Sequence, residues 1–161
     1  MNIVYVVSRW GEPSQTFVRR EAHAVADLGV TVTAASLKPP VAGDPIRALH
    51  LGAVQVVVGL LRVLLQHPLR LCRVLWTVIW VCAPRTLVRQ FVAALVGAAW
   101  VGSGDLPAGH LHAQFGWVAA TAAWSAATID GRTFSVSLHA FEIHDRRFVD
   151  GEELIHHSDR G

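Results

Sequence analysis

The fold expected for this chain is set by residues 2–37, NIVYVVSRWGEPSQTFVRREAHAVADLGVTVTAASL. Residues 2–7 are apolar and rich in β-branched side chains, which is typical of a strand buried on both faces of a parallel sheet. Residues 14–28 carry apolar side chains at helical spacing, and Gly29 is a typical residue to end that helix. Residues 30–37 return to β-branched alternation. A strand, a helix and a second strand form a βαβ unit, which predicts a parallel α/β sheet.

The turn at residues 8–16 is a candidate anion-binding site. A helix N-terminus offers backbone N–H groups and a partial positive charge, which suit a phosphate. Gly11 allows close approach of the backbone, while Ser14, the candidate N-cap, and Thr16 add hydroxyl groups. The turn lacks the glycine-rich patterns of dinucleotide- and phosphate-binding loops, so a plain capped turn is the alternative interpretation.

Two further strands are predicted in the second half of the chain. Residues 110–114, HLHAQ, form a short strand, the chain turns at Phe115 and Gly116, and an Ala-rich helix follows over residues 117–129. Residues 131–144, GRTFSVSLHAFEIH, then contain an alternating apolar run. This order extends the sheet by a second strand–helix–strand unit.

His139 ends the alternating run, and Glu142 and His144 follow it. Ligands of open α/β sheets bind at the carboxyl ends of strands, where loops carry exposed polar groups. A histidine at that position can accept a proton from a bound hydroxyl near neutral pH. The alternative is a strand-end histidine that only caps a carbonyl.

Residues 41–109 form a helical stretch of unusual charge. No acidic residue occurs between Asp44 and Asp105, although several arginines do: Arg47, Arg62, Arg70, Arg73, Arg85 and Arg89. Prolines divide the stretch into helix-sized pieces, and Pro68 and Pro84 suit first helical positions. No piece reaches the roughly 18–20 uncharged residues that span a bilayer.

Two interpretations of this helical stretch remain open. On a helical wheel Arg62, Arg70 and Arg73 share one narrow face, although Pro68 would kink or split such a helix. An apolar helix with only positive charge on its polar side is typical of a helix that lies on an anionic membrane surface. The alternative is a helical hairpin packed on the sheet, with its arginines in water.

Composition restricts the class of protein. The chain has 161 residues, 52% of them hydrophobic, and a net charge of only +2, which does not suggest nucleic acid as a partner. Cys72 and Cys82 lie in apolar helical sequence and are expected to be small buried hydrophobes in a reducing compartment. No signal peptide opens the chain, so the expected location is the cytoplasm.

Three segments carry a family resemblance. The first is YVVSR at residues 5–9 with PSQTFVRRE at 13–21, the second is HAQF at 112–115, and the third is HAFEI at 139–143. In this order they resemble the N-terminal half of family-4 glycosyltransferases, which have the two-domain GT-B fold, and especially the branch that builds colanic acid and other exopolysaccharides. Gln114 stands where that branch has a second histidine, and Glu142 where it has an aspartate.

The resemblance implies a Rossmann-like, doubly wound parallel sheet that forms the acceptor-binding half of a retaining sugar transferase, with an Arg-bearing helical insertion at about 45–104. The transferase would move a sugar from a nucleotide-sugar donor to a glycan or lipid-linked acceptor in polysaccharide biosynthesis. His139 would be catalytic, close to the transferred sugar. The implied substrate-binding residues are Gly11, Ser14, Thr16, His112, Phe115, Gly116 and Glu142. No metal or other cofactor is expected, because helix N-termini and basic side chains hold the donor phosphates.

In this family a second domain binds most of the nucleotide-sugar, and the 161 residues do not include it. The resemblance therefore implies an incomplete enzyme, inactive alone, whose partners are a separate C-terminal half and the inner face of the cytoplasmic membrane. Arg62, Arg70 and Arg73 are the expected membrane contacts.

Two other functions are compatible with the sequence. His110 and His112 project from one face of a strand, as a metal-binding pair requires, and His139, His144 and Asp145 could complete the site of a metal-dependent hydrolase. Alternatively, the chain is a non-enzymatic fragment that binds a membrane or a partner subunit through its Arg-bearing helices.

Overall fold

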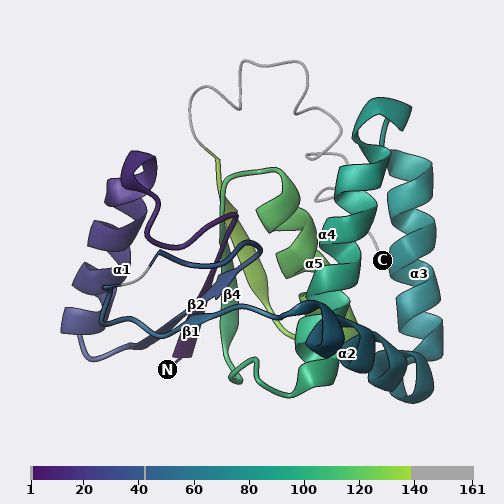
Figure 1. The fold of residues 1–161 in the computed structure, drawn as a ribbon, viewed down its shortest axis with the longest axis horizontal. Helices are drawn as coiled ribbons and strands as arrows, with labels where there is room; N and C mark the ends of the chain where they lie inside the picture. The colour runs from purple at the N-terminus through teal and green to yellow at the C-terminus, as the bar shows by residue number, and fades with distance from the viewer. Residues whose placement is uncertain (1, 42, 139–161) are drawn as a thin grey trace.

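The computed structural model describes residues 2–41 and 43–138 and shows an α/β fold around a five-stranded parallel sheet (Figure 1). The strand order is β3-β2-β1-β4-β5. The strands are β1 (Asn2–Val7), β2 (Thr31–Ser36), β3 (Ala48–Leu49), β4 (His110–Gln114) and β5 (Phe134–Ser137). The predicted parallel α/β sheet is confirmed, and the order is consistent with a Rossmann-like fold.

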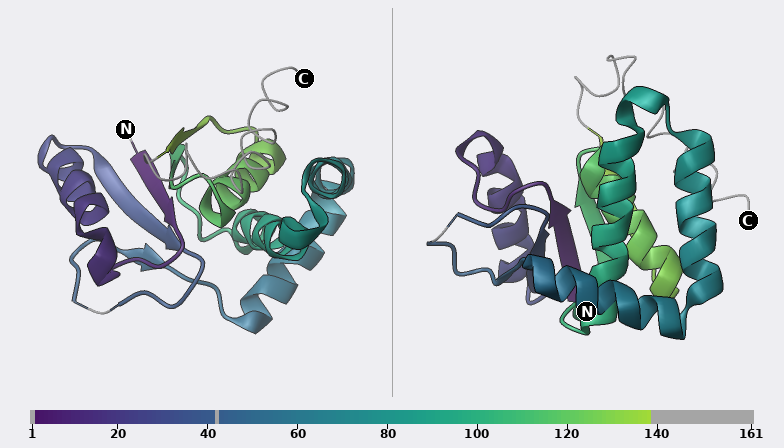
Figure 2. Two further views of the ribbon diagram at one scale, coloured as in Figure 1. Left: turned by 90° about the horizontal axis from the view of Figure 1, so that it is seen from above. Right: turned by 45° about the vertical axis from the view of Figure 1, so that its right-hand side comes forward.

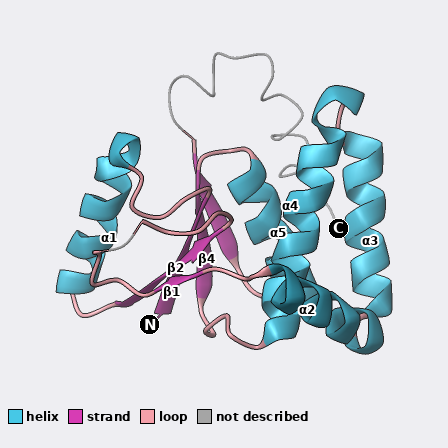
Figure 3. Ribbon diagram, viewed as in Figure 1, coloured by secondary structure: helices cyan, strands magenta, loops and turns pink. Residues whose placement is uncertain are grey.

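Helices cover both faces of the sheet. They are the 3-10 turn η1 (Pro13–Gln15), α1 (Thr16–Asp27), α2 (Ala53–Gln66), α3 (Pro68–Val81), α4 (Pro84–Ser103) and α5 (Val118–Asp130). Helix α1 lies on one face, and α5 and α4 lie on the other (Figures 1 and 3). Helices α2 and α3 pack against α4 on the side away from α1 (Figure 2).

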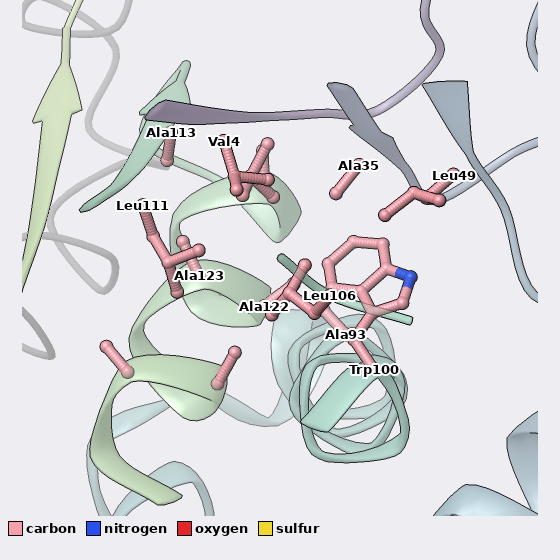
Figure 4. Packing of buried hydrophobic residues seen from close by; sticks show 14 of the residues in the cluster. Val4, Ala35, Leu49, Ala93, Trp100, Leu106, Leu111, Ala113, Ala122 and Ala123 are labelled. Atoms are coloured by element: carbon pink, nitrogen blue, oxygen red, sulfur yellow. The ribbon is translucent and has the colours of Figure 1, made fainter. Parts of the chain in front are cut away.

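The central strand β1 shows why the sheet is buried on both faces. It pairs in parallel with β2 and with β4, so that Val4 lies beside Thr33 on one side and Leu111 on the other. Tyr5 and Val7 contribute to the core beneath α1. Val4 and Val6 contribute to the core beneath α4 and α5, with Trp100 and several alanines (Figure 4). A continuous apolar strand is therefore required here rather than an alternating one.

Helices α2, α4 and α5 approach one another closely through small residues. A Cβ atom added to Gly97 of α4 would overlap the backbone of Ala122 in α5. A Cβ added to Gly59 of α2 would overlap the backbone of Ala99, and one added to Gly102 would overlap that of Gly59. Glycine and alanine at these contacts allow backbones to touch where larger side chains would separate them.

Several local predictions are confirmed. Helices α3 and α4 begin at Pro68 and Pro84, because proline has no N–H to lose at the first helical position. Gly29 follows α1 with a positive φ of 83°, and its N–H donates to the carbonyl of Ala26. Strand β4 covers residues 110–114 as expected.

Other expectations are wrong. Ser14 does not cap α1, because Pro13 starts a 3-10 turn that contains Ser14, and Gln15 precedes α1. Cys72 is exposed, whereas Cys82 is buried, and neither forms a disulfide. Helices α2 and α3 are bent by 113° at their junction, so Arg62 shares no helical face with the arginines of α3.

Residues 45–104 contain β3 and three helices, of which only α4 lies in the layer that covers the sheet. Helix α4 packs on α5 and contributes Ala93, Ala99 and Trp100 to the core beneath the sheet, so it belongs to the layer that covers the sheet. Helices α2 and α3 lie outside that layer (Figure 2). His139, Glu142, His144 and Asp145 lie outside the described residues.

Candidate functional site

The strand order defines where a ligand would bind. Strand β1 leads into α1 on one face of the sheet, and the adjacent strand β4 leads into α5 on the other. The loops after two such strands diverge, which leaves a crevice at the carboxyl edge of the sheet. This strand order therefore places the candidate site at the carboxyl ends of β1 and β4.

A hollow of about 680 Å³ lies at this edge, on the side of α4. Its lining comes from the loops after two strands, with Ser8 following β1 and Leu37 and Lys38 following β2. The N-terminal half of α4 contributes Arg89 and several valines, and the start of α5 contributes Trp117. We call this feature the edge hollow.

The edge hollow combines two cations with apolar walls. Lys38 and Arg89 are its charged lining residues, and both are exposed. Within the described part of the chain, neither side chain forms a hydrogen bond or an ion pair. Val88 and Val92 of α4 form part of the apolar wall. Two unneutralised cations beside aliphatic side chains suit a ligand that has an anionic group next to a hydrocarbon group.

Two predicted site residues lie in the loop between β4 and α5. Phe115 has a positive φ of 76°, which is uncommon for a residue other than glycine. Its N–H donates to the carbonyl of Ser137, and its ring packs edge-on against Phe17 at 5.9 Å between centroids. Gly116 is buried, and a Cβ atom there would overlap the side chain of Leu138. The loop is therefore fixed between β5 and the start of α1.

The predicted residues of the first turn lie apart from the edge hollow. Gly11 has a φ of 81°, and a Cβ there would lie 3.0 Å from the Cβ of Val41. The close approach that glycine allows is therefore made by the chain itself, where the Val41 N–H donates to the Trp10 carbonyl. Thr16 lines a smaller hollow of about 240 Å³ on α1, together with Arg19 and His23.

His112 belongs to a polar network on the opposite face of the sheet, beneath α1. Glu21 of α1 is its centre, because Tyr5 Oη donates to one carboxylate oxygen at 2.9 Å and Gln114 Nε2 donates to the other at 3.0 Å. His112 Nε2 lies 3.7 Å from the same carboxylate, and its ring packs edge-on against Tyr5. Gln114, which replaces the second histidine of the family pattern, supplies a neutral donor that needs no protonation.

The network continues along β4 and β5 through serines. Ser135 Oγ lies 2.7 Å from His112 Nδ1 and 2.8 Å from His110 Nε2, while Ser137 Oγ lies 3.2 Å from His112 Nε2. These contacts are all satisfied when neutral His112 carries its proton on Nδ1 and donates to Ser135. A neutral imidazole thus links the two strands.

Burial determines the protonation of this network. The pKa of His112 lies below its ordinary value because burial disfavours the charged ring; Glu21 partly offsets this effect and His110 adds to it. Burial and the hydrogen bond to Glu21 raise the pKa of Tyr5, which stays protonated. Glu21 keeps 45% of its side chain exposed, so it is the member of the network that solvent and solutes reach.

The two histidines of the predicted metal pair, His110 and His112, do lie close together. His110 and His112 project from one face of β4, as their spacing predicted, and Ser135 Oγ lies between them. Among residues 2–41 and 43–138, no group of three histidine, cysteine or acidic side chains is placed to hold a metal ion. The other residues of the hydrolase hypothesis, including His139, lie outside the described residues.

The structure gives two of the three predicted membrane arginines a contact within the fold. Arg70 Nη1 donates to the carbonyl of Ile129, in the last turn of α5, at 2.6 Å. Arg62 Nη1 makes longer contacts, of 3.4 and 3.5 Å, to the carbonyls of Gly102 and Ser103 at the end of α4. A cation at a helix C-terminus favours the helix dipole. Arg73 is exposed.

Sequence reasoning missed the residues that line the edge hollow. Ser8 and Lys38 directly follow strands, so the rule that drew attention to His139 could have found them. Arg89 and Trp117 carry no such signal, since their position depends on how α4 and α5 dock. Glu21 stood within the first matched segment but was not assigned a role.

Searches of protein-family models, of curated proteins and of solved structures return no match to this chain.

Proposed function

We propose that this chain is the acceptor-binding domain of a glycosyltransferase that moves a sugar from a nucleotide-sugar to a glycan or lipid-linked acceptor in polysaccharide biosynthesis. Three segments with the family pattern support the proposal; the first spans the end of β1 and the start of α1, and the second spans the end of β4. In that family, a second domain binds the nucleotide-sugar. Helices α2 and α3 would be a variable addition to the acceptor domain.

The edge hollow is the observation that carries the proposal. A lipid-linked acceptor has a phosphate or diphosphate group next to a hydrocarbon chain. Lys38 and Arg89 would bind the phosphate oxygens, because both cations are free of partners among the described residues. The valines of α4 and Leu37 would contact the first part of the hydrocarbon chain. Donor phosphates would be neutralised by basic side chains and helix N-termini, without a metal.

In this proposal His139 is the catalytic residue. It follows β5 in the sequence, and β5 ends at the carboxyl edge of the sheet. Its imidazole would hydrogen-bond the reacting sugar or the acceptor hydroxyl and so stabilise the charge that develops as the donor phosphate leaves. Glu142 would orient the acceptor.

The acceptor site can be tested with farnesyl diphosphate as the probe, using the full chain and calorimetry. We expect Lys38→Gln combined with Arg89→Gln to weaken binding by at least about tenfold, because each lost charge-assisted hydrogen bond is worth about 1.5–3 kcal/mol. The matched control is Arg47→Gln combined with Arg85→Gln, which removes two exposed cations that do not line the edge hollow. Equal binding by both double variants, or equal binding of farnesol, would contradict the proposed acceptor site.

Sugar transfer needs a separate experiment. Donor hydrolysis and transfer are measured for this chain with and without the protein encoded immediately downstream. Activity that needs both proteins supports a two-part transferase, and His139→Ala should then reduce turnover by orders of magnitude while the chain stays folded. Near-normal turnover of that variant would exclude the catalytic role of His139.

A binding module without catalysis is the second candidate. It is favoured by a large exposed apolar surface on α2 and α3, which sugar transfer by itself does not require. Transfer activity in the two-protein assay would reject it.

A further inference from the structure

Helices α2 and α3 expose an apolar surface that no described segment covers. Its members lie on the sides of the two helices that point away from α4: Val54, Val57, Val58, Leu61, Leu64, Leu65, Leu69, Trp76, Ile79 and Trp80. Leu65 and Leu69 are 82% and 83% exposed, and Trp80 is 71% exposed. We call this surface the outer apolar face.

This surface is not explained by packing within the fold. The inner sides of the two helices are already used, since Val63, Val74 and Val78 are buried against α4 and α5. Both helices are therefore apolar on two sides, whereas a surface helix normally carries polar residues on its outer side. Several large apolar side chains exposed on the same pair of helices mark a binding surface for a protein or a membrane.

The charges on these helices favour a membrane over a protein as the partner. Every charged residue of α2, α3 and α4 is an arginine, and no acid occurs between Asp44 and Asp105. Arg73, Arg85 and Arg89 are exposed. Aliphatic residues with arginines as the only charges are the composition of helices that lie on anionic lipid surfaces. Tryptophans such as Trp76 and Trp80, whose rings are 5.6 Å apart, prefer the boundary between lipid and water.

We propose that the outer apolar face seats this domain on the surface of an anionic lipid bilayer, with α2 and α3 lying in the headgroup region. Arg73 and Arg85 would contact lipid phosphates, and the leucines and tryptophans would enter the acyl boundary. This inference concerns a surface remote from the polar network and does not rest on sugar transfer.

The same helices are not arranged as a membrane span. Helices α2 and α3 together have the length and composition of a span, but they are bent by 113° at their junction. Helix α4 is also long and apolar enough to span a membrane, but half of its most apolar stretch is buried within the fold, as in a core helix. Its buried Gln90 accepts a hydrogen bond from Thr121 of α5 at 2.7 Å. Attachment along the surface agrees with this geometry better than insertion across the bilayer.

The proposed orientation places the edge hollow close to the lipid. The end of α3 and the start of α4 lie at the same end of the molecule as the carboxyl ends of the strands (Figure 1). Val88 and Val92, which are exposed on α4, also line the edge hollow. Exposed apolar side chains of α4 therefore lie at the edge hollow as well.

The test measures co-sedimentation of the full chain with vesicles of phosphatidylcholine, with and without phosphatidylglycerol. We expect binding to require phosphatidylglycerol, and Leu65→Gln with Leu69→Gln to weaken it by about tenfold or more, since each leucine side chain loses its transfer into an apolar environment. The matched control is Leu28→Gln, at the end of α1, because Leu28 is also 82% exposed. Arg73→Gln should weaken binding about fivefold on anionic vesicles.

The outcomes separate a bilayer from other partners. A blue shift of tryptophan emission on anionic vesicles that is lost in Trp76→Phe with Trp80→Phe supports the proposal. Equal vesicle binding by the Leu28 variant and the Leu65 and Leu69 variant would overturn it. The absence of vesicle binding, together with a wild-type dimer that the leucine substitutions dissociate, would overturn it as well, because a second copy would then cover the face. Circular dichroism confirms that each variant is folded.

Discussion

Helices α1 and α3 lie on opposite sides of the molecule and expose different chemistry to their surroundings. The outer side of α1 carries charged residues, and Arg19 donates to Asp44 at 2.6 Å. The outer side of α3 carries Leu69, Trp76 and Trp80 with no acid nearby in the sequence. One helix is suited to water and the other to an apolar surface.

The inner sides of the two layers differ as well. Helix α1 is held over β1 and β4 by Glu21, whose carboxylate accepts hydrogen bonds from Tyr5 and Gln114. Helix α4 is held on α5 by backbone contact at Gly97 and Ala122. The first layer is therefore sensitive to pH through its titratable groups, and the second is sensitive to side-chain volume where the two backbones touch. Four substitutions test this difference.

The largest expected effect comes from side-chain volume in the second layer. Gly97→Ala should destabilise the protein by about 3 kcal/mol or more, because the added methyl group overlaps the backbone of Ala122 and the two helices must separate. Urea unfolding measures the change. In the control Gly52→Ala, the nearest atom lies 3.5 Å from the added Cβ, and the cost should stay within about 1 kcal/mol. Equal stability of the two variants would show that α4 and α5 are not closely packed.

The second prediction separates two arginines of α3. Arg70→Gln should lower the free energy of unfolding by about 1 kcal/mol, since it removes the hydrogen bond to the carbonyl of Ile129 at the end of α5. Arg73→Gln should change it by less than about 0.5 kcal/mol, because the exposed side chain of Arg73 makes no hydrogen bond or ion pair with any described residue. Identical unfolding midpoints for the two variants would contradict the structural role of Arg70.

The third prediction concerns the ion pair that attaches α1 to the loop after β2. Burial alone would raise the pKa of Asp44, but hydrogen bonds from the Ile46 N–H, Arg19 and His23 hold that pKa below its ordinary value. Asp44→Asn should therefore cost about 1 kcal/mol at neutral pH, a modest figure because Arg19 is partly exposed.

Acid should abolish this difference. A lowered pKa means that Asp44 stabilises the folded state above its ordinary pKa of about 3.9, and that this contribution is lost as the pH falls through the lower pKa of the folded state. The difference in free energy of unfolding between wild type and Asp44→Asn should therefore disappear in acid. Asp27→Asn, which removes an exposed carboxylate from the end of α1, is the control and should have little effect at neutral pH. A stability difference that stays constant with pH would exclude the negative charge of Asp44 as its cause.

The smallest effect is expected at His112. Burial lowers its pKa below the ordinary value of about 6.5, so the unfolded chain binds a proton more readily than the folded chain. The stabilisation of the folded state by neutral His112 is complete above about pH 6.5 and is lost as the pH falls toward the lower pKa of the folded state. His112→Gln should flatten the stability profile between about pH 7 and about pH 5. An unchanged profile, matching that of His67→Gln outside the network, would contradict the prediction.

Local sequence predicted much of the fold. The limits of β1 and β4 follow from their apolar pattern, and the first residues of α3 and α4 follow from the prolines at positions 68 and 84, which act within a few residues of the chain. Strand β3 was not predicted, because Ala48 and Leu49 pair with β2 and carry no strand pattern of their own. Of the predicted site residues, Phe115 and Gly116 lie at the carboxyl edge of the sheet, directly after β4, but they do not line the edge hollow.

The sequence by itself determined the βαβ unit, the parallel sheet and the acid-free helical stretch, because these depend on backbone chemistry and residue order. Only the tertiary structure decided what the arginines do: the bend between α2 and α3 directs Arg70 to the end of α5, and the docking of α4 brings Arg89 beside Lys38. It also left the leucines and tryptophans of α2 and α3 exposed. Such placements depend on how helices pack, and residues far apart in the sequence determine that packing together.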